Sequence, residues 1–168
     1  SVTRGSLTIA VDLPAVEEAE RLLRACLLPL RPLGIAVTGS DALLRRLAVT
    51  VRQEPKTYLG FVECLSRLDE WSLRKWSFPP LYQSGIVYEA ETYGAEVWQT
   101  TPALYLRGRG DCEDLAAHRV AEHRVGGERA RVNMVLSGRT SFGGRLFHFN
   151  VLLPSGRIED PSRVLGME

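Results

Sequence analysis

Apolar and polar residues alternate over residues 7–13 and again over 47–51, the period of a strand with one buried face. Between these two stretches, apolar residues recur at helical spacing over 14–30, and an apolar run at 35–38 indicates a further short strand. A serine begins the segment 40–46 and suits the cap of a short helix. The N-terminal part is therefore predicted to form a small β-α-β unit, with a short helix before its last strand.

The remainder of the chain alternates between helical and strand-like patterns. A second long helix is predicted over 56–76, and the two prolines that follow it mark a break. Further elements are predicted as a short helix at 102–107, a helix over 111–121, and strands at 129–136, 146–153 and 157–160. With 168 residues, the chain is long enough for one domain, or for one domain with a small appendage.

Composition excludes several classes of function. The 21 basic and 20 acidic residues give a net charge of +1, so no overall field attracts nucleic acid or an anionic membrane. No apolar run reaches membrane-spanning length. The three cysteines are too few for a disulfide framework and form no CxxC pair, which predicts a reducing, cytoplasmic location. Cys26 and Cys64 lie on apolar faces of predicted helices and are interpreted as core residues.

Cys112 lies where a glycine-rich loop, 107–110, meets the start of a predicted helix. Free backbone N–H groups and the positive end of the helix dipole favour a reactive thiolate there, and the same amides can stabilise an oxyanion. Asp111, Glu113 and Asp114 oppose this effect, because nearby negative charge raises the pKa of a thiol. The local sequence therefore leaves two readings open: a nucleophile, or a buried inert cysteine.

A second candidate group lies in the strand pattern at 147–153. If residues 154–156 form a three-residue hairpin loop, Asn150 faces Asp160, and His148 lies diagonal to Asp160 on the same face of the sheet. A loop one residue shorter would turn Asp160 to the other face. A base beside a nucleophile, oriented by a carboxylate, is the arrangement of a catalytic triad. The alternative is a surface histidine followed by an Asp-Pro turn.

Two further histidines, His118 and His123, are five residues apart on one predicted helix and do not share a face. Asp114 and His118 are four apart, and we interpret them as a pair on the helix surface. A metal site formed by Asp114, His118 and His123 remains an alternative, because these are ligand-type side chains.

Four segments, in the same order, resemble the bacterial transglutaminase-like superfamily. Gly-Asp-Cys-Glu-Asp-Leu-Ala at 110–116 resembles its cysteine-helix motif, and Arg-Ala-Arg-Val at 129–132 resembles the strand that follows. The segments 147–151 and 159–162 resemble its histidine strand and its aspartate motif. Many relatives have His-Ala-Trp or His-Val-Trp where this chain has His-Phe-Asn, so the subfamily stays open.

The resemblance implies an α+β fold with a papain-like core, in which the helix bearing the cysteine packs on an antiparallel sheet bearing the histidine and the aspartate. Residues 53–168 would form this core, and residues 1–52 would be an accessory β-α-β unit. Cys112, His148 and Asp160 would be the triad, with neither metal nor organic cofactor. Relatives use an upstream side chain as an oxyanion donor, for which Gln99 and Trp98 are the candidates, although Trp98 also suits an aromatic core position.

The implied activity is hydrolysis of peptide or amide bonds through a thioester acyl-enzyme, with a protein or peptide as substrate. A protein-crosslinking acyltransferase would use the same triad, because an amine replaces water in the second step. A catalytically idle interaction module is a third possibility, with residues 1–52 as the docking unit and the strands at 7–13 and 47–51 as possible free edges. By the same resemblance, compact versions are also encoded by bacteriophages near virion genes, which suggests a virion-associated context.

Overall fold

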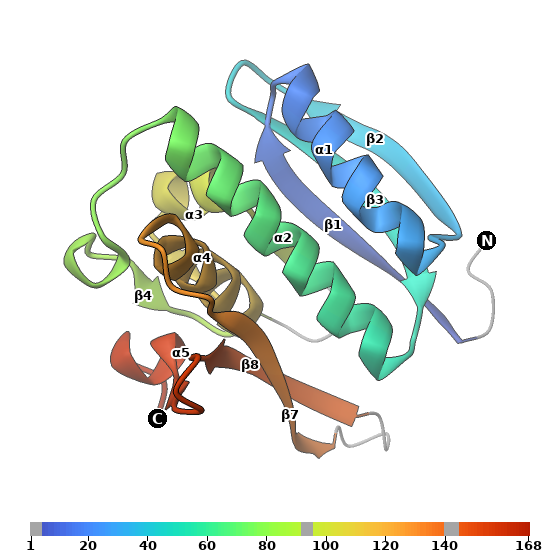
Figure 1. The fold of residues 1–168 in the computed structure, drawn as a ribbon. Helices are drawn as coiled ribbons and strands as arrows, with labels where there is room; N and C mark the ends of the chain where they lie inside the picture. The colour runs from blue at the N-terminus through green and yellow to red at the C-terminus, as the bar shows by residue number, and fades with distance from the viewer. Residues whose placement is uncertain (1–4, 92–95, 140–144) are drawn as a thin grey trace.

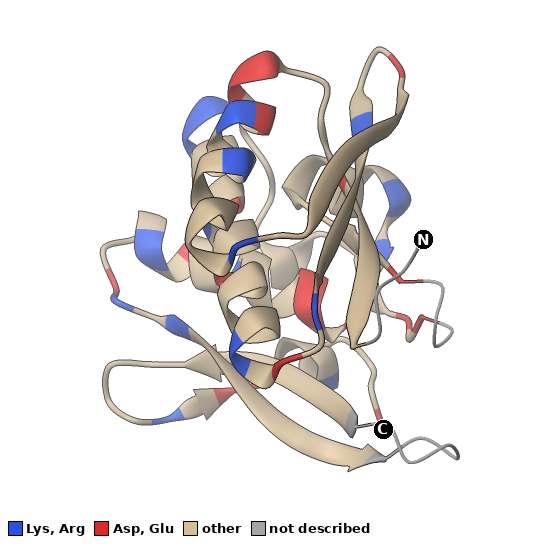
Figure 2. Cartoon of the chain, turned by 90° about the vertical axis from the view of Figure 1, so that its right-hand side faces the viewer, with Lys and Arg blue, Asp and Glu red and all other residues tan. Residues whose placement is uncertain are grey.

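The computed structural model describes residues 5–91, 96–139 and 145–168, with the side chains of Arg139 and Arg145 left out (Figure 1). The described residues form an α+β fold with five α-helices and three β-sheets, which confirms the α+β class that was predicted. No helix among them is both long and apolar enough to span a bilayer. In Figure 2, basic and acidic residues are interspersed, as expected from the near-zero net charge.

The N-terminal sheet contains four strands in the order β2-β3-β1-β5. Its strands are β1 (Ser6–Pro14), β2 (Gly34–Ser40), β3 (Leu44–Arg52) and β5 (Val97–Gln99), and α1 (Glu17–Leu27) with the short 3-10 helix η1 (Leu28–Leu30) connects β1 to β2. β3 pairs antiparallel with β1 and with β2, whereas β5 pairs parallel with β1. β3 is therefore paired on both sides, so the free edge predicted for it is wrong, and β5 covers the edge predicted for β1 at Ala10–Asp12.

The predicted short helix at 40–46 is also wrong. The Asp41 carboxylate accepts hydrogen bonds from the backbone N–H groups of Leu43 and Leu44, both at 2.8 Å. This local contact turns the chain, so that β2 and β3 form a hairpin instead of entering a helix.

The long helix α2 (Pro55–Lys75) joins the N-terminal sheet to the rest of the molecule, and it lies beside α1 in Figure 1. Its residues Phe61, Val62, Leu65 and Leu68 are fully buried in one hydrophobic cluster, which extends from the N-terminal strands to the C-terminal sheet. β5 comes from the C-terminal part of the chain but pairs with β1. The division at residue 52 stays a prediction about folding units, and both sides of it contribute to one core.

The C-terminal half is built from short elements around one helix, α4 (Cys112–Val125). An antiparallel sheet β7-β8-β9 packs beside it, and α4 contacts α2 and β8 more than any other elements. The elements are η2 (Leu81–Gln83), β4 (Val87–Tyr88), α3 (Thr101–Arg107), β6 (Arg109–Gly110), β7 (Arg131–Arg139), β8 (Arg145–Leu152), β9 (Ile158–Glu159) and α5 (Pro161–Val164). A helix that begins at the cysteine thus packs on the strand that bears the histidine.

Substitution of Phe61 tests whether the N-terminal and C-terminal parts of the chain share one core. Its ring is fully buried and makes an edge contact with Trp98 of β5, at a centroid distance of 4.9 Å. Phe61→Ala should lower the free energy of unfolding by about 3–5 kcal/mol, because it leaves a cavity where α2 meets β5. Leu28→Ala, at a side chain that is 70% exposed, should change it by less than about 0.5 kcal/mol. Urea denaturation followed by circular dichroism measures both, and equal small losses would contradict a common core.

Candidate active site

Cys112 is the first residue of α4, and the turn before it is tightly built. The Asp111 carboxylate caps the helix and accepts from the Cys112 N–H at 2.7 Å, while Asp114 accepts from the Asp111 N–H at 3.1 Å. A Cβ on Gly110 would lie only 2.7 Å from the Leu104 Cδ1 atom and 3.1 Å from the Asp114 Cβ, so the chain needs glycine there. The capping box therefore fixes where the helix begins, and with it the position of the cysteine.

The Cys112 thiol is buried, with 8% of the residue exposed, and it contacts two polar groups. The Phe149 backbone N–H lies close enough to the thiol to lower its pKa, and the thiol donates to the Glu113 carboxyl, whose Oε2 atom lies 3.5 Å from Sγ. Burial raises the pKa of the thiol well above its usual value, and Glu113 and Asp111 raise it further, whereas the Phe149 N–H lowers it. Burial and the nearby carboxyl groups therefore outweigh the groups that lower the thiol pKa. The uncharged thiol is therefore the ground state at neutral pH.

The predicted hairpin register is confirmed. Val151 pairs with Glu159, and Leu152 pairs with Ile158, which aligns Asn150 with Asp160 as the three-residue loop requires. His148 and Asp160 meet, with Nε2 of the ring 2.8 Å from Oδ2 of the carboxylate. Both side chains are mostly buried, at 13% and 17% exposed. The carboxylate thus holds one ring nitrogen and leaves Nδ1 free to take part in chemistry.

Cys112 lies beside the strand that bears His148. Phe149, whose N–H reaches the thiol, is the residue after His148 in β8. β9 ends at Glu159, opposite Val151, so the edge of β8 beyond it is open to the N-terminus of α4. In this structure the Cys112 thiol and the His148 ring are not hydrogen-bonded to each other, and catalytic contacts of this kind often tighten only when substrate binds.

Gln99 and Trp98 both lie beside α4, but their polar groups are engaged. The Gln99 amide donates to the Asp114 carboxylate at 3.1 Å and to the Arg109 carbonyl at 2.9 Å. The Trp98 indole packs against aromatic rings of α2 and β8, and its N–H points to Glu96 at 3.3 Å. An oxyanion would have to replace one of these partners, so the oxyanion roles stay predictions, while the observed contacts join β5 to the helix.

The surface pair expected from Asp114 and His118 is wrong, because both side chains are fully buried. His118 binds the Thr101 hydroxyl through Nδ1, at 2.7 Å, and the Tyr105 hydroxyl through Nε2, at 3.1 Å. His123 points elsewhere, to Glu159. A surface pair requires that one face of the helix be solvated, but α2, α3 and β8 enclose α4. The alternative metal site made of Asp114, His118 and His123 is therefore not assembled.

Carboxylates gather beside the nucleophile, a feature that the sequence reading noted only in part. The ligand atoms of Glu91, Glu113 and Asp114 lie within 4.8 Å of one another, as do those of Asp111, Cys112 and Glu113. These are the described groups whose oxygen atoms could hold a divalent cation. Burial raises the pKa values of Glu113 and Asp114 well above the usual range, and the Glu113 Oε1 atom is buried with no hydrogen-bond partner among the described residues.

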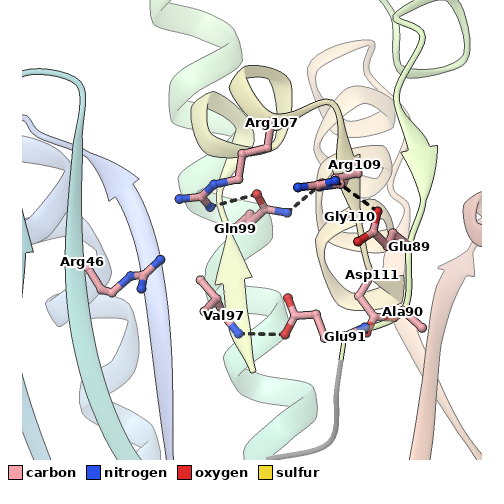
Figure 3. Close-up of a pocket in the computed structure, with 10 residues that line it drawn as sticks. All are labelled: Arg46, Glu89, Ala90, Glu91, Val97, Gln99, Arg107, Arg109, Gly110 and Asp111. Carbon is pink, nitrogen blue, oxygen red and sulfur yellow. Dashed lines mark hydrogen bonds and ion pairs between the residues drawn. The ribbon is translucent and has the colours of Figure 1, made fainter. Parts of the chain in front are cut away.

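A cavity of about 350 Å³ lies beside β5, and Gly110 and Asp111 contribute to its wall (Figure 3). Three arginines line it, with Arg107 bound to the Gln99 carbonyl oxygen at 3.0 Å and Arg109 paired with Glu89 at 3.5 Å. Glu89 and Glu91 also line the cavity, and the Glu91 carboxylate accepts from the Val97 N–H at 2.7 Å. Neither Cys112 nor His148 reaches this wall, so the cavity is separate from the triad.

The other two cysteines are not equivalent. Cys64 is buried in the core as predicted, but Cys26 is only half-buried. A hydrogen bond with Cys64 lowers the pKa of the Cys26 thiol to about 6, and Arg67 adds to the effect. Cys26 therefore competes with Cys112 for thiol-directed reagents, and any labelling of Cys112 needs a Cys26→Ala background.

Comparisons of the chain with known protein families, with curated proteins and with solved structures find no match. The resemblance to the transglutaminase-like superfamily therefore rests on the four motifs, and the function has to be argued from the site itself.

Glu91 gives the carboxylate cluster a measurable signature. Burial raises the pKa of its carboxyl to about 7, although the Val97 N–H lowers it in part. Between about pH 4.3, where the carboxyl ionises in an unfolded chain, and pH 7, the folded protein keeps a proton that the unfolded chain has lost. The contribution of Glu91 to the free energy of unfolding therefore falls as pH rises through this window, and is lost above it.

Glu91→Gln should have a Tm close to that of the wild type at pH 5 and a higher Tm at pH 8, because the amide accepts the same hydrogen bond without a charge. Thermal melts from pH 5 to 8 measure the difference, and Glu89→Gln, at the exposed neighbour on the cavity wall, should show no such divergence. Wild-type and Glu91→Gln curves that stay parallel would exclude the buried, proton-bearing carboxyl.

Proposed function

We propose that the chain is a cysteine-dependent hydrolase of peptide or amide bonds, with a papain-like core and a protein or peptide substrate. The observation that carries the proposal is the 2.8 Å contact between His148 Nε2 and Asp160 Oδ2. The residue after His148 in β8 is Phe149, whose backbone N–H lowers the pKa of the Cys112 thiol. The proposed nucleophile begins α4, the proposed base lies in β8, which packs on α4, and the proposed orienting carboxylate follows β9, which pairs with β8.

The contact with Asp160 determines how His148 works. A hydrogen on Nε2 satisfies the carboxylate, so Nδ1 carries the lone pair and accepts the thiol proton. As that proton moves, Sγ attacks the carbonyl carbon and the C=O electron pair moves to oxygen. When the tetrahedral intermediate collapses, the C–N bond breaks and His148 returns the proton to the leaving amine. Water then attacks the thioester with Nδ1 again as base, which releases the acid and restores the thiol.

The raised pKa of Cys112 selects this form of the mechanism. A preformed ion pair of thiolate and imidazolium would require a low thiol pKa. Here the raised pKa keeps the thiol protonated, so its proton moves to His148 as the carbonyl is attacked, which is general-base catalysis. The Phe149 N–H then stabilises the negative charge on sulfur as it develops.

The hydrogen-bond donors that could stabilise the developing oxyanion are already bound to other groups. The Cys112 N–H is bound to the Asp111 carboxylate at 2.7 Å, and both hydrogens of the Gln99 amide are taken by Asp114 and Arg109. A substrate oxygen at the helix N-terminus would displace the Asp111 carboxylate from the Cys112 N–H. Substrate binding is therefore expected to loosen the cap of α4.

The test is the pH dependence of Cys112 alkylation by iodoacetamide, measured in a Cys26→Ala background. His148→Ala should displace the profile to higher pH and abolish turnover of any substrate found by screening, because the base is removed. Asp160→Ala should leave a reduced rate, after a loss of about 10²–10⁴-fold, since it only orients the base. Leu146→Ala, at an exposed position two residues away in β8, should behave as the wild type.

Two outcomes would change the assignment. A profile that His148→Ala does not move would mean that the imidazole never acts on the thiol, and the hydrolase proposal would be withdrawn in favour of an idle module. Incorporation of a labelled primary amine into a glutamine peptide, in place of ammonia release alone, would reassign the same triad to acyl transfer.

A further inference from the structure

Asp160 lies between β9 and α5, so no strand pairing holds it directly. β9 has only two residues, and its pairing with β8 is limited to Glu159 with Val151 and Ile158 with Leu152. The Asp160 side chain binds His148 and lies 3.5 Å from Arg163, while its Oδ1 atom is buried with no hydrogen-bond partner among the described residues. The position of this carboxylate therefore has to be fixed by its neighbours.

The neighbour that does so is Glu159, whose carboxylate turns toward the nucleophile helix and gathers three donors. Arg119 donates through Nε at 2.5 Å, His123 lies 2.9 Å away through Nε2, and the Tyr82 hydroxyl donates as well. The Glu159 side chain is only 12% exposed. Burial alone would raise the pKa of this carboxyl, but these hydrogen bonds hold it below its usual value, so the group is ionised.

Two of the three donors belong to α4. Arg119 and His123 are four residues apart and so share one face of the helix. The Arg119 guanidinium lies over the Tyr82 ring at 4.7 Å and is also bound to Glu122, and the second ring nitrogen of His123 binds Glu128 at 2.7 Å. Ionised, partly buried hydrogen bonds of this kind are stronger than neutral ones and fix direction as well as distance.

We propose that Glu159 is a positioning residue for the triad: by binding Arg119 and His123 it locks β9 to the helix that begins at Cys112. Because an α-helix behaves as one rigid element, this contact sets the place of Asp160, and through it of the His148 ring, relative to the thiol. The inference rests on the proposed function, since a positioned base has meaning only if Cys112 is the nucleophile. Misplacement by about 1 Å is enough to cost about 10²-fold in rate.

The test compares Glu159→Gln with Glu128→Gln, both in the Cys26→Ala background. Each removes one carboxylate from His123, but only the first releases β9. Glu159→Gln should lower turnover by about 10- to 100-fold and displace the Cys112 alkylation profile, while Glu128→Gln leaves both unchanged. The downfield proton resonance of His148 Nε2–H should broaden or vanish in Glu159→Gln alone, a signature that a general loss of stability would not give.

A double variant of Glu159→Gln and Asp160→Ala distinguishes a positioning role of Glu159 from a general contribution to stability. If Glu159 acts through Asp160, adding Glu159→Gln to Asp160→Ala should cost little further rate, because the two residues act as a unit. Should Glu159→Gln fail to fold, His123→Gln removes one of the α4 contacts and should give a smaller displacement of the same sign.

The outcomes are distinguishable. A Glu159→Gln protein with a lower Tm but an unchanged alkylation profile and His148 resonance would overturn the positioning role and leave the hydrolase proposal intact. Additive losses in the double variant would likewise overturn it. An alkylation profile that even His148→Ala does not move would overturn both proposals at once.

Discussion

The packing of α4 against β8 is the contact on which the rest of the site depends. It brings the first turn of a helix to the open edge of a strand, at the point where β9 has ended. A single backbone donor, the Phe149 N–H, then reaches the Cys112 thiol, and the preceding residue of the strand is the histidine. The buried face of α2, packed on the other side of α4, holds that helix in place.

The electrostatics of this contact run against a ready-made thiolate. The helix dipole favours negative charge at Cys112, but burial and the adjacent carboxyl groups raise its pKa by more than the dipole and the Phe149 amide lower it. Burial and the neighbouring carboxyl groups likewise raise the pKa values of Glu113 and Asp114. In the proposed mechanism, activation of the thiol is therefore assigned to His148, oriented by Asp160, rather than to the helix N-terminus.

Local rules predicted the parts of the site that depend on local geometry. The length of the 154–156 loop determined the hairpin register, and with it the meeting of His148 and Asp160. The same rules failed where tertiary packing decides: His118 is enclosed because three elements surround its helix, and β5 joins the first sheet through a pairing of distant segments. The contact between Cys26 and Cys64 likewise depends on two helices meeting, which no spacing along the chain reports.

The most direct test of the central claim is to trap the acyl-enzyme. A small activated ester, p-nitrophenyl acetate, can be mixed with the protein, quenched within seconds, and the acylated residue located by peptide mass spectrometry. An active triad predicts a rapid burst of acetylation at Cys112 in the Cys26→Ala protein, followed by slow release, and no burst in the same protein carrying His148→Ala. Acetylation of Cys112 at equal rates with and without the histidine would contradict the account.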